Sequence, residues 1–207
     1  MALNDLKALR PDGYRWWNKR NKPLAGLCVH YAGAYDSALS VVKDNIKDEA
    51  WVRAHPDASK AQAEAAGVRL TPRSFHISNG QGDDEPLVCL IPPADVAWHA
   101  PGLNVDFLGV ENVAPKGAQF TPAQERRLIT IGETLIREHN IKYITAHRFG
   151  TKDGEGSTDC PGWLFGPGGP PNPKAQSKAV RTFGPPSTRE QFEAWVSKHF
   201  GSSYIVR

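Results

Sequence analysis

The chain has few cysteines, almost no excess of one charge and no long apolar run, and each scarcity excludes a class of protein. Its 207 residues include three cysteines, Cys28, Cys89 and Cys160. Three are too few for a disulfide framework, and an odd number cannot all be paired. No apolar run approaches the roughly 18 residues that span a bilayer, so we expect no membrane insertion. The N-terminus has polar residues where the apolar part of a secretory signal peptide would lie, so we expect synthesis in a cytoplasm without such a signal.

The charge balance is close to neutral. There are 25 Lys and Arg against 22 Asp and Glu, a formal net charge of +3, which is far from the basic excess of a nucleic-acid-binding protein. Hydrophobic residues make up 40% of the chain, enough to bury a core. The length and composition therefore predict one globular domain, expected to be a monomer with no nucleic-acid partner.

Short apolar runs bounded by glycine or proline predict the strands. Residues 24–31 (LAGLCVHY) are the first such run, and the acidic, Gly-rich turn NGQGDDE predicts a connection between two further strands. The predicted strands are 24–31, 73–78, 86–91, 107–113 and 142–146.

Composition and capping residues predict the helices between these strands. Residues 36–67 are rich in Ala, Lys, Asp and Glu, and Pro56 divides them into two helices. Thr121 with Gln124 three residues later is a capping box that starts a third helix. Strands alternating with helices indicate an α/β fold with a mixed β-sheet flanked by helices.

The chain divides into three segments. Residues 1–23 are polar and predict an N-terminal arm with a short helix, whereas 24–166 hold the domain itself. Residues 167–207 predict a Gly/Pro-rich linker and a C-terminal helix packed on the domain, with Ser187 and Glu190 as its capping box. This extension is too short to be a second domain.

Two histidines and a cysteine have the setting of metal ligands. His30 (LCVHYAG) and His147 (ITAHRFG) end apolar strands, and Cys160 (STDCPGW) follows in a Gly/Pro-rich loop. Two imidazoles and one thiolate make a three-ligand zinc site with a fourth position open for water. The residues alone leave open the alternative of two hydrogen-bonding histidines and a small buried cysteine.

Seven motifs in a fixed order resemble the zinc-dependent N-acetylmuramoyl-L-alanine amidases, a family that includes phage endolysins, wall-recycling amidases and peptidoglycan recognition proteins. The motifs are LCVHYAG, SFHISNG, VAWHAPG, LGVENV, TPAQERRLITIGETLI, ITAHR and STDCPG. The resemblance implies that 24–166 is the amidase domain. It also implies that His30, His147 and Cys160 bind Zn²⁺, with Asp159 a poorer candidate for the third ligand.

The resemblance also implies the catalytic residues. Glu111 in LGVENV matches the general base that some branches use. Other branches use a tyrosine at the position that Phe75 holds here. Phenylalanine cannot transfer a proton, so the resemblance assigns the base to Glu111. Thr158 stands where several members have a lysine, and it would donate a hydrogen bond to the oxyanion. Lys152 lies in the same loop and could fold back.

Two more histidines lie in these motifs. The resemblance leaves three roles open for His99 in VAWHAPG: it donates to the scissile carbonyl oxygen, it orients the muramyl group, or it only braces its loop with Trp98. His76 is expected to pack or hydrogen-bond within the sheet.

The activity implied is hydrolysis of the amide between N-acetylmuramic acid and the L-alanine of the stem peptide, with bacterial peptidoglycan as the partner. A mildly basic chain suits an anionic wall, so a phage endolysin acting on the wall after release is favoured. The alternatives are a recognition module that binds without cutting and a cytoplasmic muropeptide-recycling amidase. A recognition module is favoured by Phe75, while retention of all three metal ligands favours an enzyme.

Overall fold

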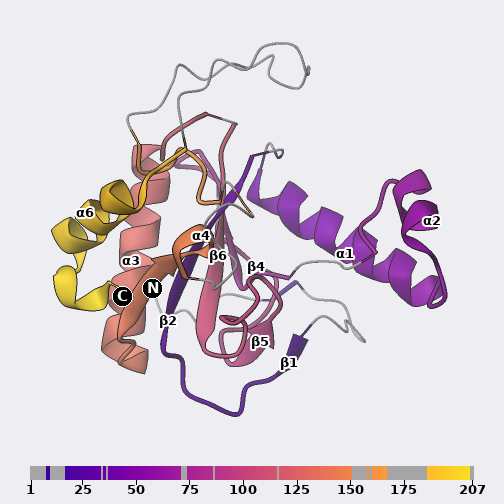
Figure 1. Ribbon diagram of the computed structural model, residues 1–207, viewed down its shortest axis with the longest axis horizontal. Helices are drawn as coiled ribbons and strands as arrows, with labels where there is room; N and C mark the ends of the chain where they lie inside the picture. The colour runs from indigo at the N-terminus through magenta and orange to yellow at the C-terminus, as the bar shows by residue number, and fades with distance from the viewer. Residues whose placement is uncertain are drawn as a thin grey trace.

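The computed structural model has one layer of mixed β-sheet between two layers of helix (Figure 1). This is the α/β class expected from the alternating strand and helix patterns. The described residues are 8–9, 17–33, 35, 37–70, 74–85, 87–115, 117–150, 158, 160–166 and 186–205.

The central sheet has five strands in the order β4-β3-β6-β2-β7. β3, β6, β2 and β7 run parallel, and β4 pairs antiparallel with β3 at one edge. All five strands predicted from the apolar runs are present; only the 107–113 strand has the expected length, and β3 and β4 are much shorter than expected. Their bounds are β2 Gly26–Ala32, β3 Ile77–Asn79, β4 Val88–Cys89, β6 Phe107–Val113 and β7 Tyr143–Ala146.

One face of the sheet is covered by α3 (Pro122–His139). Its stripe of Leu128, Ile131 and Leu135 is fully buried in the main core cluster, together with the strand residues that point to this face. Thr121 caps the helix and Gln124 completes the capping box, as the sequence predicted.

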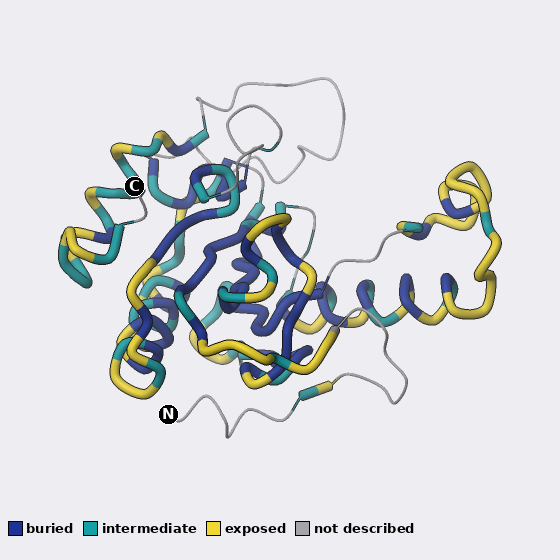
Figure 2. The backbone as a smooth tube through the Cα atoms, turned by 60° about the horizontal axis from the view of Figure 1, so that its bottom comes forward, coloured by how far each residue is buried: buried dark blue, intermediate teal, exposed yellow. Residues whose placement is uncertain are grey.

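The other face packs against α1 (Ala38–Ala54), whose Val41 and Val42 contact the sheet in two smaller apolar clusters. α2 (Lys60–Ala65) follows, so the division of 36–67 into two helices is confirmed. Figure 2 shows that α2 and the far end of α1 extend away from the body and are largely exposed.

The described part of the N-terminal arm differs from the expectation of a helix. Trp17–Lys19 form strand β1, which pairs antiparallel with β5 (Asp95–Ala97) in a separate two-stranded sheet. β1 pairs with β5 from a distant part of the chain, so the residues near β1 carry no local pattern that predicts this strand. Residues 1–7 and 10–16 of the arm lie outside the described part.

The C-terminal helix α6 (Arg189–His199) packs Phe192 and Val196 into the core beside α3. Its cap is Thr188 with Gln191, one residue later than predicted. The hydroxyl of Ser187 instead accepts a hydrogen bond from the Phe165 N–H at 3.0 Å, so it anchors the start of the helix to the preceding segment. The 3-10 helix η2 (Ser202–Tyr204) follows. Within the described residues, no helix combines the length and apolarity needed to cross a bilayer.

Candidate metal centre

The strand register brings the two predicted histidine ligands and the predicted base together. His30 on β2 is paired with Glu111 on β6, and Val29 is paired with Ala146, the last residue of β7. His147 follows as the first residue of the short helix α4 (His147–Gly150). Because paired residues of parallel strands point to the same face, His30 and Glu111 lie side by side at the carboxyl end of the sheet, where open α/β sheets bind ligands. α4 follows directly on β7 and contacts β2 (Figure 1).

Cys160 completes the cluster from a loop. Its backbone carbonyl accepts a hydrogen bond from the Arg148 N–H at 3.0 Å, which ties the loop to α4. The ligand atoms of His30, His147 and Cys160 all lie within 4.8 Å of one another. His30 is 2% exposed and Cys160 9% exposed, so the three donors face one another in a largely water-excluded site.

These distances fit a tetrahedral ion. The Cys160 Sγ lies 3.6 Å from the His30 Nδ1, and the ring centroids of His30 and His147 are 4.9 Å apart. With Zn–S of about 2.3 Å and Zn–N of about 2.05 Å, a tetrahedral angle places sulfur and nitrogen about 3.6 Å apart. The residues present therefore fit a zinc ion held by three protein ligands, with one position left for a substrate or water.

Glu111 lies beside this cluster at the wall of a small pocket. The side chain is buried, and it lines a cavity of about 170 Å³ together with Phe75 and with Arg69 from the segment after α2. The Phe75 ring stands edge-on to His30 at a centroid distance of 5.5 Å. Phe75, which stands where the resemblance places a tyrosine in some branches, therefore lies next to His30 and carries an apolar ring.

His99 contacts the candidate metal ligand His30 directly. Its Nδ1 lies 2.9 Å from the His30 Nε2, and its Nε2 lies 3.3 Å from the Phe107 carbonyl oxygen. Burial lowers the pKa of His99 to about 3, which keeps the ring neutral.

His76 hydrogen-bonds within the sheet layer, as predicted. Its Nδ1 accepts from the Gly109 N–H at 3.0 Å and its Nε2 lies 3.0 Å from the Asp95 carbonyl oxygen. Burial lowers the pKa of His76 well below its usual value. The ring therefore joins the β5 segment to β6 as a neutral group.

The remaining predicted residues lie in the loop before Cys160. The Thr158 hydroxyl accepts a hydrogen bond from the Cys160 N–H at 3.1 Å, so it lies next to the third candidate ligand. Lys152 and Asp159 lie outside the described residues.

Three residues next to the site were not predicted from the sequence. Cys28 lies two residues before His30 on the same strand face, and its ligand atom is within 4.8 Å of those of His30 and His99. Alternation along β2 predicts this placement. Asn104 and Gly109 support His99 through contacts between distant segments, and no local pattern identifies them.

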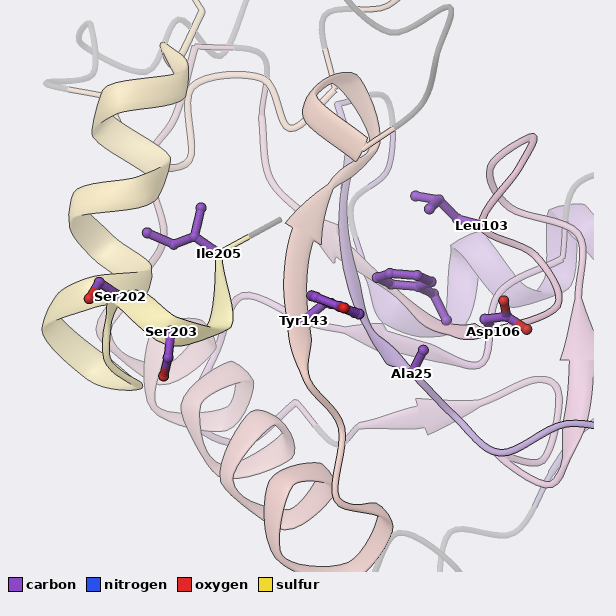
Figure 3. Close-up of a pocket in the computed structure, with 8 residues that line it drawn as sticks. Ala25, Leu103, Asp106, Tyr143, Ser202, Ser203 and Ile205 are labelled. Carbon is purple, nitrogen blue, oxygen red and sulfur yellow. The ribbon is translucent and has the colours of Figure 1, made fainter. Parts of the chain in front are cut away.

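A different pocket lies at the opposite end of the strands (Figure 3). It has a volume of about 630 Å³ and includes residues next to or at the starts of β2, β6 and β7. Its lining contains no histidine or cysteine, so the metal-ligating chemistry of the described residues gathers at the other edge. The lining residues are Ala25, Leu103, Asp106, Phe107, Tyr143, Ser202, Ser203 and Ile205.

Solved structures share this architecture. A selenomethionine derivative of AmpD is 18% identical with a TM-score of 0.51, and the match covers 92% of this chain and 93% of that one. PlyL is 18% identical with a TM-score of 0.51, covering 75% and 84%. The Ph2119 endolysin from Thermus scotoductus MAT2119 bacteriophage Ph2119 is 17% identical with a TM-score of 0.50, covering 75% and 87%. At these identities the likeness shows the fold alone.

A match to a whole family is more specific than these likenesses. No curated protein matches the chain. The family model of N-acetylmuramoyl-L-alanine amidases matches residues 20–163, which is more than half of the sequence and includes the clustered His30, His147 and Cys160. The chain therefore belongs to the N-acetylmuramoyl-L-alanine amidase family.

Proposed function

We propose that this chain is a zinc-dependent amidase that separates the stem peptide of peptidoglycan from N-acetylmuramic acid. The observation that carries the proposal is the convergence of His30, His147 and Cys160, with donor atoms within 4.8 Å of one another, beside the buried carboxylate of Glu111. This donor set matches catalytic zinc sites, which keep one coordination position open.

The amide carbonyl is a weak electrophile and water is a weak nucleophile. The site has groups that would activate each of them. A zinc ion held by the three ligands supplies Lewis acidity, which polarises the carbonyl and lowers the pKa of water toward about 7. Glu111 accepts a proton as water adds to the carbonyl carbon, and it returns that proton to the alanine nitrogen as the C–N bond breaks. The products are the lactyl carboxylate and a free α-amino group.

Negative charge develops on the carbonyl oxygen as water adds. Thr158 lies next to Cys160, and its hydroxyl has a hydrogen to donate while it accepts from the Cys160 N–H. One well-placed donor of this kind contributes about 3 kcal/mol to the stabilisation of the transition state. His99 was the second candidate donor, but both of its ring nitrogens contact protein atoms.

Within this activity, we propose an endolysin that reaches the wall after release from the cytoplasm and acts as a monomer. The likeness to a bacteriophage endolysin supports this setting, as does the small positive net charge. A recycling amidase is the second candidate, because the motif resemblance includes that branch of the family. A binding module is the third, favoured by Phe75 at the position of the catalytic tyrosine.

The test combines metal analysis with product analysis. We expect about one zinc per purified chain, and we expect digestion of isolated walls to release new α-amino groups of alanine without new reducing ends of sugars. The same preparation is assayed on small soluble muropeptides.

The outcomes separate the three settings. Clearing of walls supports the endolysin, whereas activity restricted to soluble muropeptides supports the recycling amidase. Wall binding with bound zinc and no new amino groups supports the recognition module. A native protein that takes up no zinc at micromolar concentration contradicts the proposal in all its forms.

A further inference from the structure

Both ring nitrogens of His99 are engaged by protein atoms. The Nε2 lies 3.3 Å from the Phe107 carbonyl oxygen at the start of β6, and the Nδ1 lies 2.9 Å from the Nε2 of His30. The other nitrogen of His30, Nδ1, faces the Cys160 sulfur at 3.6 Å. A continuous chain of contacts therefore runs from a backbone carbonyl, through His99 and His30, to the metal-binding cluster.

The Phe107 carbonyl determines which nitrogen carries the hydrogen in each of these contacts. A carbonyl oxygen can only accept, so the Nε2 of His99 must carry the hydrogen. A neutral imidazole has a single N–H, so the Nδ1 of His99 is then an acceptor. The hydrogen between the two rings consequently belongs to the Nε2 of His30, which leaves the lone pair of its Nδ1 directed at the cluster.

We propose that His99 is a positioning residue, which holds the ligand His30 in its Nε2–H tautomer and so presents the Nδ1 to the metal. The inference rests on the zinc site of the proposed function. A bond to the second nitrogen of a ligating histidine fixes both the tautomer and the orientation of its ring. His99 then has no N–H left for the substrate, because its single hydrogen is given to Phe107.

The surroundings hold His99 in this geometry. The Asn104 Oδ1 accepts hydrogen bonds from the backbone N–H groups of His99 at 2.8 Å and Ala100 at 2.7 Å, which fixes the backbone below the ring. Gly109 on β6 leaves the space that the ring fills, since a Cβ there would lie 2.7 Å from the His99 Cγ. The ring is thus seated against β2 and β6, and His99 is only 4% exposed.

Two substitutions separate hydrogen bonding from packing. In His99→Asn the amide oxygen can take the place of the Nδ1, whereas His99→Leu fills similar space without an acceptor. We expect His99→Leu to weaken zinc affinity by about 10- to 100-fold, the usual loss for an outer-sphere partner of a ligand. We expect His99→Asn to retain most of the wild-type affinity. In the cobalt-substituted proteins, we expect the ligand-field spectrum to change in His99→Leu and to stay like the wild type in His99→Asn.

A measurement on the wild-type protein needs no variant to fold. Long-range ¹H–¹⁵N correlation spectra of the zinc-loaded protein are expected to show His30 protonated at Nε2 and bound through Nδ1. They are expected to show His99 protonated at Nε2 and unprotonated at Nδ1.

The possible failures are distinguishable. A wild-type chain that binds no zinc contradicts the proposed function itself. A chain that binds zinc through the His30 Nε2 contradicts the positioning role, as does His99→Leu with unchanged affinity and an unchanged cobalt spectrum. If His99→Leu keeps full zinc affinity and loses turnover at saturating zinc, His99 is a donor to the oxyanion instead.

Discussion

At the residue scale, the proposed roles of Glu111 and Cys160 can be tested separately although both residues lie at the same site. Cys160 supplies a donor atom to the cluster, whereas Glu111 is absent from both groups of potential metal ligands in the described residues and lies one strand away in register with His30. A carboxylate that only moves protons can lose its charge without loss of the metal, whereas a missing thiolate leaves two donors.

We therefore expect Glu111→Gln to keep about one zinc per chain and to lose turnover by at least about 100-fold, the usual share of general acid–base catalysis. Cys160→Ala should lose both zinc and turnover. Metal analysis and amino-group release from walls check the two side by side. Full activity of Glu111→Gln would show that another group moves the proton.

At the scale of elements, α3 depends on its N-terminal cap to cover the sheet. The Thr121 side chain accepts from the Gln124 N–H at 3.2 Å, and its hydroxyl donates to the Gln81 carbonyl oxygen at 2.6 Å in the loop after β3. The cap thus joins the helix to the sheet as well as satisfying a free N–H.

Thr121→Ala is expected to lower the free energy of unfolding by about 1–2 kcal/mol, since loss of a cap costs about that much. Thr130→Ala, on the exposed face of the same helix, is the control and should change stability by less than about 0.5 kcal/mol. Urea unfolding measures both. Equal effects of the two substitutions would mean that the cap has no special contribution.

At the scale of the whole molecule, buried neutral histidines make stability depend on pH. The pKa of His76 in the folded state lies well below the unfolded value of about 6.5, so the unfolded chain binds the proton first as pH falls. This contribution to stability is complete above about pH 6.5 and is lost progressively below it.

The metal-free protein should therefore lose up to about 1.4 kcal/mol of unfolding free energy per pH unit below pH 6 for each such histidine. His76→Gln removes one titrating group, so its stability should fall less steeply with acid, although it starts from a lower value. Thr130→Ala on the exposed face of α3 removes no titratable group, so it is the control and should follow the wild-type slope. Unfolding in urea at several pH values, with chelator present, compares the three slopes. Identical slopes for all three proteins would contradict the role of His76.

Much of the fold could be predicted because its signals are local. β6 occupies the expected residues 107–113, and α3 starts at the expected cap, since apolar runs and capping boxes act within a few residues. β1 was missed because it forms only by pairing with β5, far along the chain. The cap of α6 was placed one residue early because Ser187 is used by Phe165, a contact that no local pattern shows.

The sequence by itself determined which groups can do chemistry here: two histidines at strand ends, a cysteine before Pro-Gly and a glutamate within an apolar strand. Only the tertiary structure decided how they meet, because the parallel register of β2, β6 and β7 sets His30 beside Glu111 and next to His147. It also decided the contacts of His99, since a hydrogen bond between rings 69 positions apart depends on the space left by Gly109 and on the orientation of a backbone carbonyl.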